Sequence, residues 1–213
     1  MDDQRAYWDR VAAEKTFTHP INARWMADWV SRSGRILDYG CGYGRTLNDL
    51  ARLGFKNALG VDFSAPMIER GRSTYPRLDL QVIDQLPLAE PDASFDAALL
   101  FAVLTCVPTD DDQARIVAEL HRLLRPGGVL YISDMPLQSD ARNLARYAAG
   151  EARFGTWGAF ETGDGAVMRH HPPRHFDTLL QGFDRLVAEQ VPLTTMNGHA
   201  ATGLQILARR RPG

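Results

Sequence analysis

The chain has 213 residues, 45% of them hydrophobic, which is enough to bury one core of ordinary size. Its formal net charge of −2 gives no broad attraction to phosphate backbones, so nucleic acid is not expected as a partner. The polar start carries no apolar signal core, and no apolar run reaches the ~20 residues of a membrane span. We expect one soluble, cytoplasmic domain over residues 1–213, without a membrane partner and with reduced cysteines.

The first third of the chain changes from helical to alternating patterns. Two one-sided helical patterns fill residues 1–33 and are separated by His19-Pro20. Strands and helices then alternate through residues 34–134, with Ser64 and Thr109 as expected N-caps and a helix stop at Pro126-Gly127-Gly128. This alternation predicts a parallel sheet with helices on both faces and a ligand at the carboxyl ends of its strands. The expected strands are 35–39, 58–61, 78–83, 95–101 and 129–133.

The first strand runs into the glycine loop Gly40-Cys41-Gly42-Tyr43-Gly44. A glycine loop after a buried strand lets backbone N–H groups approach a ligand closely, because no Cβ blocks the approach. The spacing is G-x-G-x-G, and Arg45 stands where a dinucleotide-binding fingerprint would need its third glycine. An NAD-linked oxidoreductase is therefore the least favoured alternative.

The glycine loop resembles the first motif of class I S-adenosylmethionine (SAM)-dependent methyltransferases. Residues 91–104 and 122–134 resemble the fourth and sixth motifs of this family, so the resemblance runs from about residue 35 to 134. It implies a Rossmann-like α/β fold: a seven-stranded, mostly parallel sheet whose last strand is antiparallel. The final hairpin is expected from about 185–192 and 204–209. It also implies SAM as cofactor and S-adenosylhomocysteine (SAH) as product.

Three acids, Asp38, Asp62 and Asp84, end successive predicted strands. Asp62 lies where a carboxylate can accept both ribose hydroxyls, although an acid near a helix start is also favoured by the helix dipole. The resemblance implies that Asp84 meets the adenine amine and that Asp38 orients the loop or meets the methionine ammonium; helix capping is the alternative for Asp38. The full expected set of cofactor contacts is Asp38, Gly40, Cys41, Gly42, Gly44, Asp62, Phe63, Met67, Asp84, Gln85, Leu86 and Phe101.

Residues 135–175 form an insertion after the fifth strand, which we interpret as a lid over the substrate. Asp164-Gly165 predicts a hairpin turn within it. The alternative is a dimer-forming arm anchored on Trp157 and Phe160, which would make the protein a homodimer. Residues 176–213 then supply a helix and the final hairpin.

Histidines are the candidate general bases, because their pKa lies near neutrality. His170, His171 and His199 are expected near the ligand edge, but His170 and His171 point to opposite faces if extended, so at most one faces the pocket. No metal site is expected, because no third ligand stands at an informative spacing. The expected substrate pocket is Tyr7, Phe17, His19, Trp25 and Trp157.

The sequence therefore predicts an enzyme that methylates a small-molecule acceptor by SN2 displacement at the sulfonium of SAM. Leu100-Phe101-Ala102-Val103 lacks the Asn/Asp-Pro-Pro-aromatic signature of N-methylases that act on nucleic acids. A protein or RNA methyltransferase and a non-catalytic SAM-binding regulatory protein are the alternatives.

Overall fold

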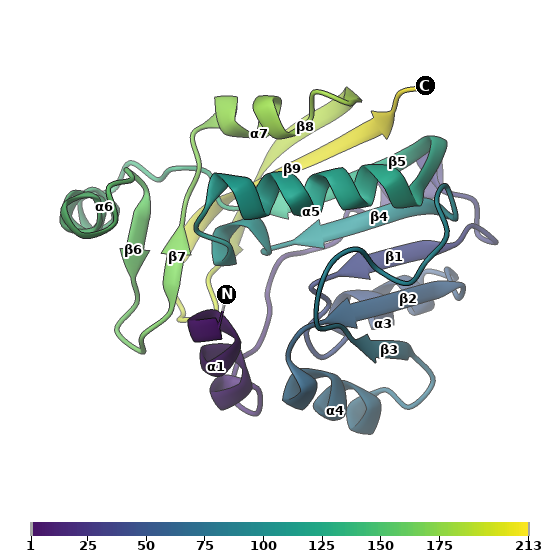
Figure 1. Cartoon of the computed structure of the whole chain (residues 1–213), viewed down its shortest axis with the longest axis horizontal. Helices are drawn as coiled ribbons and strands as arrows, with labels where there is room; N and C mark the ends of the chain where they lie inside the picture. Colours follow the sequence, from purple (N-terminus) through teal and green to yellow (C-terminus); the bar gives the residue numbers. More distant parts are fainter. Residues whose placement is uncertain (1, 213) are drawn as a thin grey trace.

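The computed structural model describes residues 2–212 and is built on one seven-stranded sheet (Figure 1). The strand order is β3-β2-β1-β4-β5-β9-β8, and every neighbouring pair is parallel except those that involve β9. The predicted fold class is confirmed, including the antiparallel last strand. The strands of this sheet are β1 (Ile36–Tyr39), β2 (Ala58–Asp62), β3 (Asp79–Val82), β4 (Phe95–Phe101), β5 (Leu124–Asp134), β8 (Phe183–Thr194) and β9 (Ala200–Arg210).

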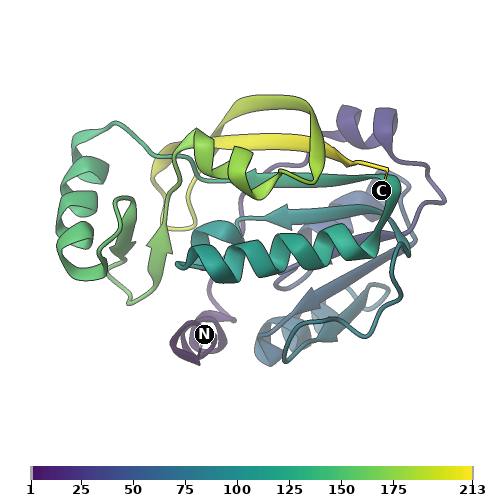
Figure 2. The same cartoon turned by 45° about the horizontal axis from the view of Figure 1, so that its top comes forward.

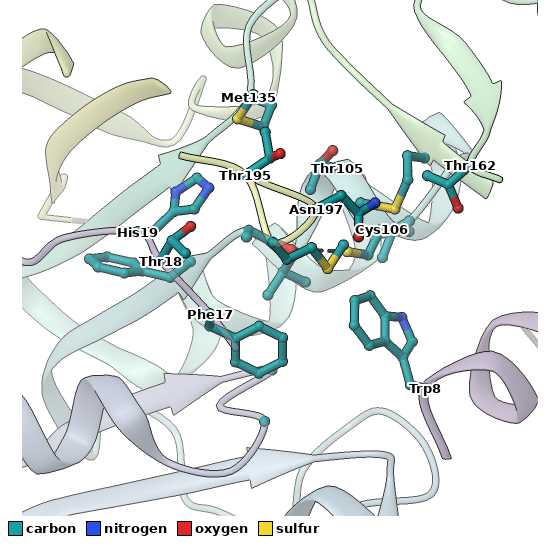
Figure 3. A pocket seen from close by; sticks show the side chains of 18 of the residues that line it. Trp8, Phe17, Thr18, His19, Thr105, Cys106, Met135, Thr162, Thr195 and Asn197 are labelled. Carbon is teal, nitrogen blue, oxygen red and sulfur yellow. Dashed lines mark hydrogen bonds between the residues drawn. The ribbon is translucent and has the colours of Figure 1, made fainter. Parts of the chain in front are cut away.

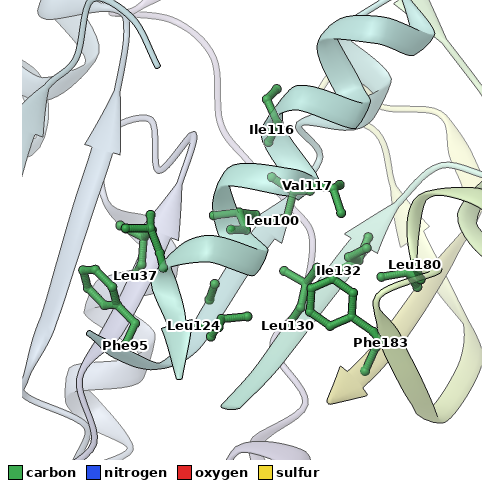
Figure 4. Packing of buried hydrophobic residues seen from close by; sticks show 14 of the residues in the cluster. Leu37, Phe95, Leu100, Ile116, Val117, Leu124, Leu130, Ile132, Leu180 and Phe183 are labelled. Carbon is green, nitrogen blue, oxygen red and sulfur yellow. The ribbon is translucent and has the colours of Figure 1, made fainter. Parts of the chain in front are cut away.

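Helices cover both faces of the sheet, as continuous apolar strands require. On one face lie α5 (Asp110–Leu123) and α7 (Pro173–Leu179) (Figure 2). They pack on the sheet through residues such as Val117, shown in Figure 4, and Phe176. On the other face the helices are α2 (Ala23–Trp29), α3 (Arg45–Arg52) and α4 (Ala65–Thr74). Ile36 and Leu37 show the alternation, because each joins the core of a different face.

Helix ends follow the local sequence. Ser64 and Thr109 cap α4 and α5, each accepting a backbone N–H three residues further on, from Met67 and Asp112. The expected helix stop at Pro126 is three residues too late, because α5 ends at Leu123. Pro126 disfavours helix at Arg125, the residue before it, and the chain is already extended one residue earlier, at Leu124.

Helix α1 and the insertion (residues 135–175) lie beyond the carboxyl ends of the strands (Figure 1). The insertion contains α6 (Ala141–Phe154) and the antiparallel hairpin β6 (Ala159–Glu161) and β7 (Val167–Arg169), which confirms the predicted turn at Asp164-Gly165. Helix α1 (Asp2–Val11) packs in a third apolar cluster with residues of α6 and the hairpin. None of the helices within residues 2–212 has the length and apolar character that a bilayer crossing requires.

Asp164 connects these two segments. Its carboxylate accepts hydrogen bonds from Tyr7 Oη at 3.0 Å and from Lys15 Nζ at 2.5 Å, and its carbonyl accepts from Arg10 at 2.9 Å. The hairpin turn is therefore fastened to α1 and to the segment that follows it. Together they roof the space above the sheet edge.

Candidate active site

A cavity of about 360 Å³ opens at the carboxyl ends of the parallel strands. This volume lies in the range that ligand pockets span. Its floor is the glycine loop after β1 and the chain after β4, and its roof is the insertion. In Figure 3 the rings of Phe17 and Trp8 face the same space as Cys106 and Asn197. The cavity thus runs without interruption from the predicted cofactor loop to the predicted lid.

The glycine loop has the conformation that its sequence predicts. Gly40 and Gly42 have φ values of +72° and +54°, which L side chains rarely adopt. A Cβ on Gly42 would lie 2.1 Å from the ring of Phe17, which stacks on Tyr43 at a centroid distance of 5.2 Å. Glycine at 42 is therefore needed both for the turn and for the close approach of Phe17, an expected pocket residue that does line the cavity.

Asp62 is buried at the end of β2 and faces both the loop and the cavity. One carboxylate oxygen accepts from Gly42 N and the other from Ser64 N, each at 2.8 Å. Burial raises the pKa of Asp62 to about 6, although these two backbone N–H groups favour its charged form. Asp62 therefore ties the glycine loop to the start of α4, at the place where the sequence predicts a ribose contact.

Asp38 is buried beneath the glycine loop and lines the cavity. Its Oδ2 has no hydrogen-bond partner within residues 2–212. Burial raises the pKa of Asp38 to about 7, opposed by the nearby positive charge of Arg45. A buried carboxylate oxygen without a donor is costly, and an ammonium group in the cavity would satisfy it. Asp38 thus fits the ammonium of a bound methionine group.

The third acid of the predicted series is not brought to the cavity. The carboxylate of Asp84 is exposed and lies 3.2 Å from Nη1 of Arg5. Gln85 is exposed too, and Leu86 packs against the core on the α5 side. Gly44 also lies outside the lining, because it starts α3 and faces Leu78 and Leu80. The expected contacts at 84, 85, 86 and 44 are therefore not part of the cavity wall.

The remaining expected cofactor contacts all line the cavity. Phe101 ends β4 and packs edge-on against Tyr131 at a centroid distance of 4.7 Å. Ala102, which follows it, has φ of +54°, so its backbone is held in a strained conformation at the cavity wall. The expected contacts in the lining are Asp38, Gly40, Cys41, Gly42, Asp62, Phe63, Met67 and Phe101.

Three of the five expected substrate-pocket residues lie elsewhere. Tyr7 is buried and donates to Asp164, so it fastens the roof. Trp25 packs on Tyr131 at the far side of the sheet core, and Trp157, in the turn after α6, is 40% exposed. Their apolar bulk serves the packing of α1, α2 and α6. Phe17 and His19 line the cavity as expected.

His170 and His171 point to opposite sides, as the alternation of side chains along an extended segment predicts. His170 lines the cavity, and its Nδ1 lies 2.6 Å from Oη of Tyr147. His171 points the other way: it is fully buried, stacks on His175 at 4.5 Å, and cannot reach a ligand in the cavity. His199, on the turn between β8 and β9, lines the cavity and is exposed.

Burial gives the two enclosed cavity histidines low basicity. It lowers the pKa of His19 to about 4 and that of His170 to about 3, and nearby arginines act in the same direction. Both rings are therefore neutral at pH 7. Nδ1 of His19 lies 2.9 Å from Oγ of Ser133, which fixes the ring at the cavity wall.

The sequence reasoning missed a group of polar residues that line the cavity. Arg142 and Arg146 on α6, Thr162 after β6, and Thr195 and Asn197 before His199 all line the cavity. Arg142 and Arg146 are four residues apart, which places them on one helix face, and this spacing was the available signal. No local pattern marks the others, because the fold alone brings them to the cavity.

Comparison with known proteins identifies the core. A family described as "Methyltransferase domain" matches residues 37–132. The chain is 35% identical over 98 residues to a probable S-adenosylmethionine-dependent methyltransferase of Mycolicibacterium smegmatis (46% of this chain, 37% of the relative). It is also 35% identical over 136 residues to the ubiquinone biosynthesis O-methyltransferase of Xylella fastidiosa (60% and 53%). A SAM-dependent methyltransferase structure from Methanosarcina mazei superimposes with a TM-score of 0.81 at 22% identity, over 88% of this chain and 97% of that one.

The chain carries a class I SAM-dependent methyltransferase domain. The expected family, enzyme class and cofactor are confirmed for this domain. The chain spans between 37% and 57% of the length of the first curated relatives it matches. The acceptor and the activity of the whole protein are therefore matters for proposal.

Proposed function

We propose that this methyltransferase transfers the methyl group of SAM to a small molecule held in the cavity, by direct in-line displacement at sulfur. The observation that carries this proposal is the continuity of the cavity from the glycine loop and Asp38 to the roof. SAM supplies the activated methyl group and leaves as SAH. The chain's own residues align the acceptor, exclude water and accept a proton where the acceptor carries one.

Each end of the cavity has a proposed task. Asp38 holds the ammonium of the methionine group, and Asp62 accepts hydrogen bonds from the ribose hydroxyls. Residues 135–175, with α1, act as the lid that encloses the acceptor. The hydrogen bonds from Tyr7 and Lys15 to Asp164, which join the two segments, support this role. A roofed cavity of this size favours a small acceptor over a nucleic acid or a folded protein. The name of the Xylella fastidiosa relative, a ubiquinone biosynthesis enzyme, supports the same choice.

His199 is the proposed general base when the methyl acceptor must lose a proton. It is exposed at the cavity and can pass a proton to water. His170 is a weaker candidate, because burial lowers its pKa to about 3. We expect His199→Gln to reduce turnover while SAH affinity stays the same.

A labelled-methyl assay tests the proposed function. The protein is incubated with SAM carrying a tritiated methyl group and a cell extract, and the extract is separated into metabolite, protein and RNA fractions. We expect label in the metabolite fraction. Label found only in the protein or RNA fraction would contradict the small-molecule proposal. If all of the label remained in SAM, methyl transfer itself would be contradicted.

The raised pKa of Asp38 predicts that SAM binding depends on pH. The ammonium pairs with the ionised carboxylate, so binding below pH 7 must first remove a proton from Asp38. From about pH 7 down to 5, SAM affinity should fall by up to about tenfold per pH unit for each proton released. Calorimetry across this range measures the slope. In Asp38→Asn the slope should be shallower and the affinity at pH 8 lower; an unchanged slope would contradict the role of Asp38.

A further inference from the structure

We propose that the methyl acceptor is an anion whose carboxylate or phosphate group is bound by Arg142 and Arg146 of α6. This inference rests on the proposed function and adds the charge of the substrate to it. Both arginines line the cavity on one face of the same helix. They lie on the insertion, which forms the roof of the cavity, whereas the glycine loop and Asp38 belong to its floor.

Arg146 is held in place but is left without a counter-ion. Its guanidinium carbon lies 3.5 Å from the centroid of the Phe160 ring, so the charged group is fixed over an aromatic face. Its Nη2 lies 3.5 Å from Nε2 of His170, and the hydroxyl of Tyr147 also interacts with the guanidinium. Its buried Nε has no acceptor within residues 2–212. No carboxylate of these described residues lies within 4 Å of the guanidinium nitrogens of Arg142 or Arg146.

Other arginines of the insertion show what a purely structural role looks like. Arg153, also on α6, pairs with Glu161, and Arg169 pairs with Asp110 at 2.6 Å. Glu161 lines the cavity but its carboxylate is already engaged by Arg153. Arg142 and Arg146 therefore differ from Arg153 and Arg169, because neither has a carboxylate within ion-pair distance among the described residues and both line the cavity.

The surroundings of Arg146 suit an oxyanion. His170 is neutral at pH 7, because burial lowers its pKa to about 3, so it neither neutralises nor repels the guanidinium. The Oη of Tyr147 lies 2.6 Å from Nδ1 of His170 and fixes the imidazole ring. Burial lowers the pKa of Arg146 and the charge of Arg142 acts in the same direction, whereas Tyr147 and the charge of Asp140 oppose the shift. A bidentate carboxylate or a phosphate would supply both the missing acceptor and the missing charge.

The test uses protein saturated with SAH and three probes of similar shape: benzoate, phenyl phosphate and benzamide. We expect benzoate or phenyl phosphate to bind in calorimetry and benzamide, which is neutral, to bind at least tenfold more weakly. The tighter of the two anions identifies the carboxylate or the phosphate class. Equal binding of benzamide and the anions, or no binding of either anion at millimolar concentration, would overturn the inference.

Variants connect the selectivity to the two arginines. Arg146→Gln and Arg142→Gln should each weaken the preferred anion about tenfold or more, and Arg146→Lys should recover only part of the loss, because it lacks the planar fork. Arg174→Gln removes an exposed arginine of α7 that lies outside the cavity lining, and this matched control should bind the anion normally. An Arg146→Gln variant that still selects anions as the parent does would contradict the assignment.

Two further readouts separate this inference from the proposed function. SAH affinity should be the same in all four variants, which shows that the cofactor end is intact. When the metabolite extract is passed over an anion-exchange resin before the labelling assay, the acceptor should be retained by the resin. Label that forms only from the unretained fraction would leave methyl transfer standing and overturn the anionic acceptor.

Discussion

Asp62→Ala should weaken SAH and SAM binding by about 1–3 kcal/mol, or roughly 5- to 150-fold. Two effects act in the same direction. Under the proposed function the ribose hydroxyls lose their acceptor, and the N–H groups of Gly42 and Ser64 lose the carboxylate that holds the glycine loop in place. Isothermal titration with SAH measures the affinity. Melting of the ligand-free variant measures the second effect separately, because only the loss of the loop contacts lowers the melting temperature without ligand.

Two matched variants separate ribose binding from loop support. Asp62→Asn keeps one acceptor oxygen and should lose less affinity than Asp62→Ala. Asp84→Ala removes an exposed acid whose ion pair is with Arg5, and it should leave SAH affinity within about twofold. If Asp84→Ala weakened SAH as much as Asp62→Ala does, the adenine contact expected from the sequence would be right. The exposed position of Asp84 would then belong only to the ligand-free protein.

The sheet and the cofactor half of the site were predictable because their signals are local. A buried strand that carries Asp38 just before its last residue and runs into Gly40 and Gly42 specifies strand, turn and helix within ten residues. Asp62 was predictable for the same reason, since it follows its own strand at the spacing that such folds use. Because the strands are parallel, their carboxyl ends meet at one edge of the sheet, and this does not depend on the fold of the remaining chain.

The third acid shows where a local pattern does not by itself place a side chain. Asp84 follows β3, but the chain from 83 to 94 has no helix, and its course depends on how Leu86 packs against the α5 side of the sheet. Arg5, from a distant part of the sequence, then fixes the carboxylate outside the cavity. Neither the path of an irregular loop nor a partner 79 residues away leaves a pattern near position 84.

The roof was predictable in outline but not in chemistry. The turn at Asp164-Gly165 specified the hairpin, and alternation indicated that only one of His170 and His171 faces the pocket. Which one does so is decided by Tyr147 on α6, which contacts His170. The same helix carries Arg142 and Arg146, and its orientation depends on close packing against β6. That packing is a tertiary property, so the unpaired arginines could not be assigned from the sequence.

Gly150→Ala should disorder the roof and abolish most acceptor turnover while SAH still binds. A Cβ at position 150 would lie 1.8 Å from the carbonyl oxygen of Ala159 and 2.8 Å from its carbonyl carbon. Alanine favours a helix interior over glycine by about 1 kcal/mol, but a clash with backbone cannot be relieved by turning a side chain. Overpacking of this kind costs about 1–3 kcal/mol or more, so the clash should outweigh the gain.

Hydrogen exchange and turnover together measure this effect. Amides of α6, β6 and β7 should exchange faster in Gly150→Ala, whereas those of β1, β4 and β5 should be unchanged, because they belong to the sheet. Ala148→Gly, at an exposed position of the same helix, is the control: it loses about 1 kcal/mol of helix propensity without any clash. Helix propensity alone ranks Ala148→Gly as the more damaging change, and close packing of α6 on β6 ranks Gly150→Ala as the more damaging. The opposite result would be lower turnover, and less protection of the roof amides from exchange, in Ala148→Gly than in Gly150→Ala. It would show that the position of α6 does not depend on its contact with Ala159. The inference that this contact holds Arg146 rigidly above the cavity would then be wrong.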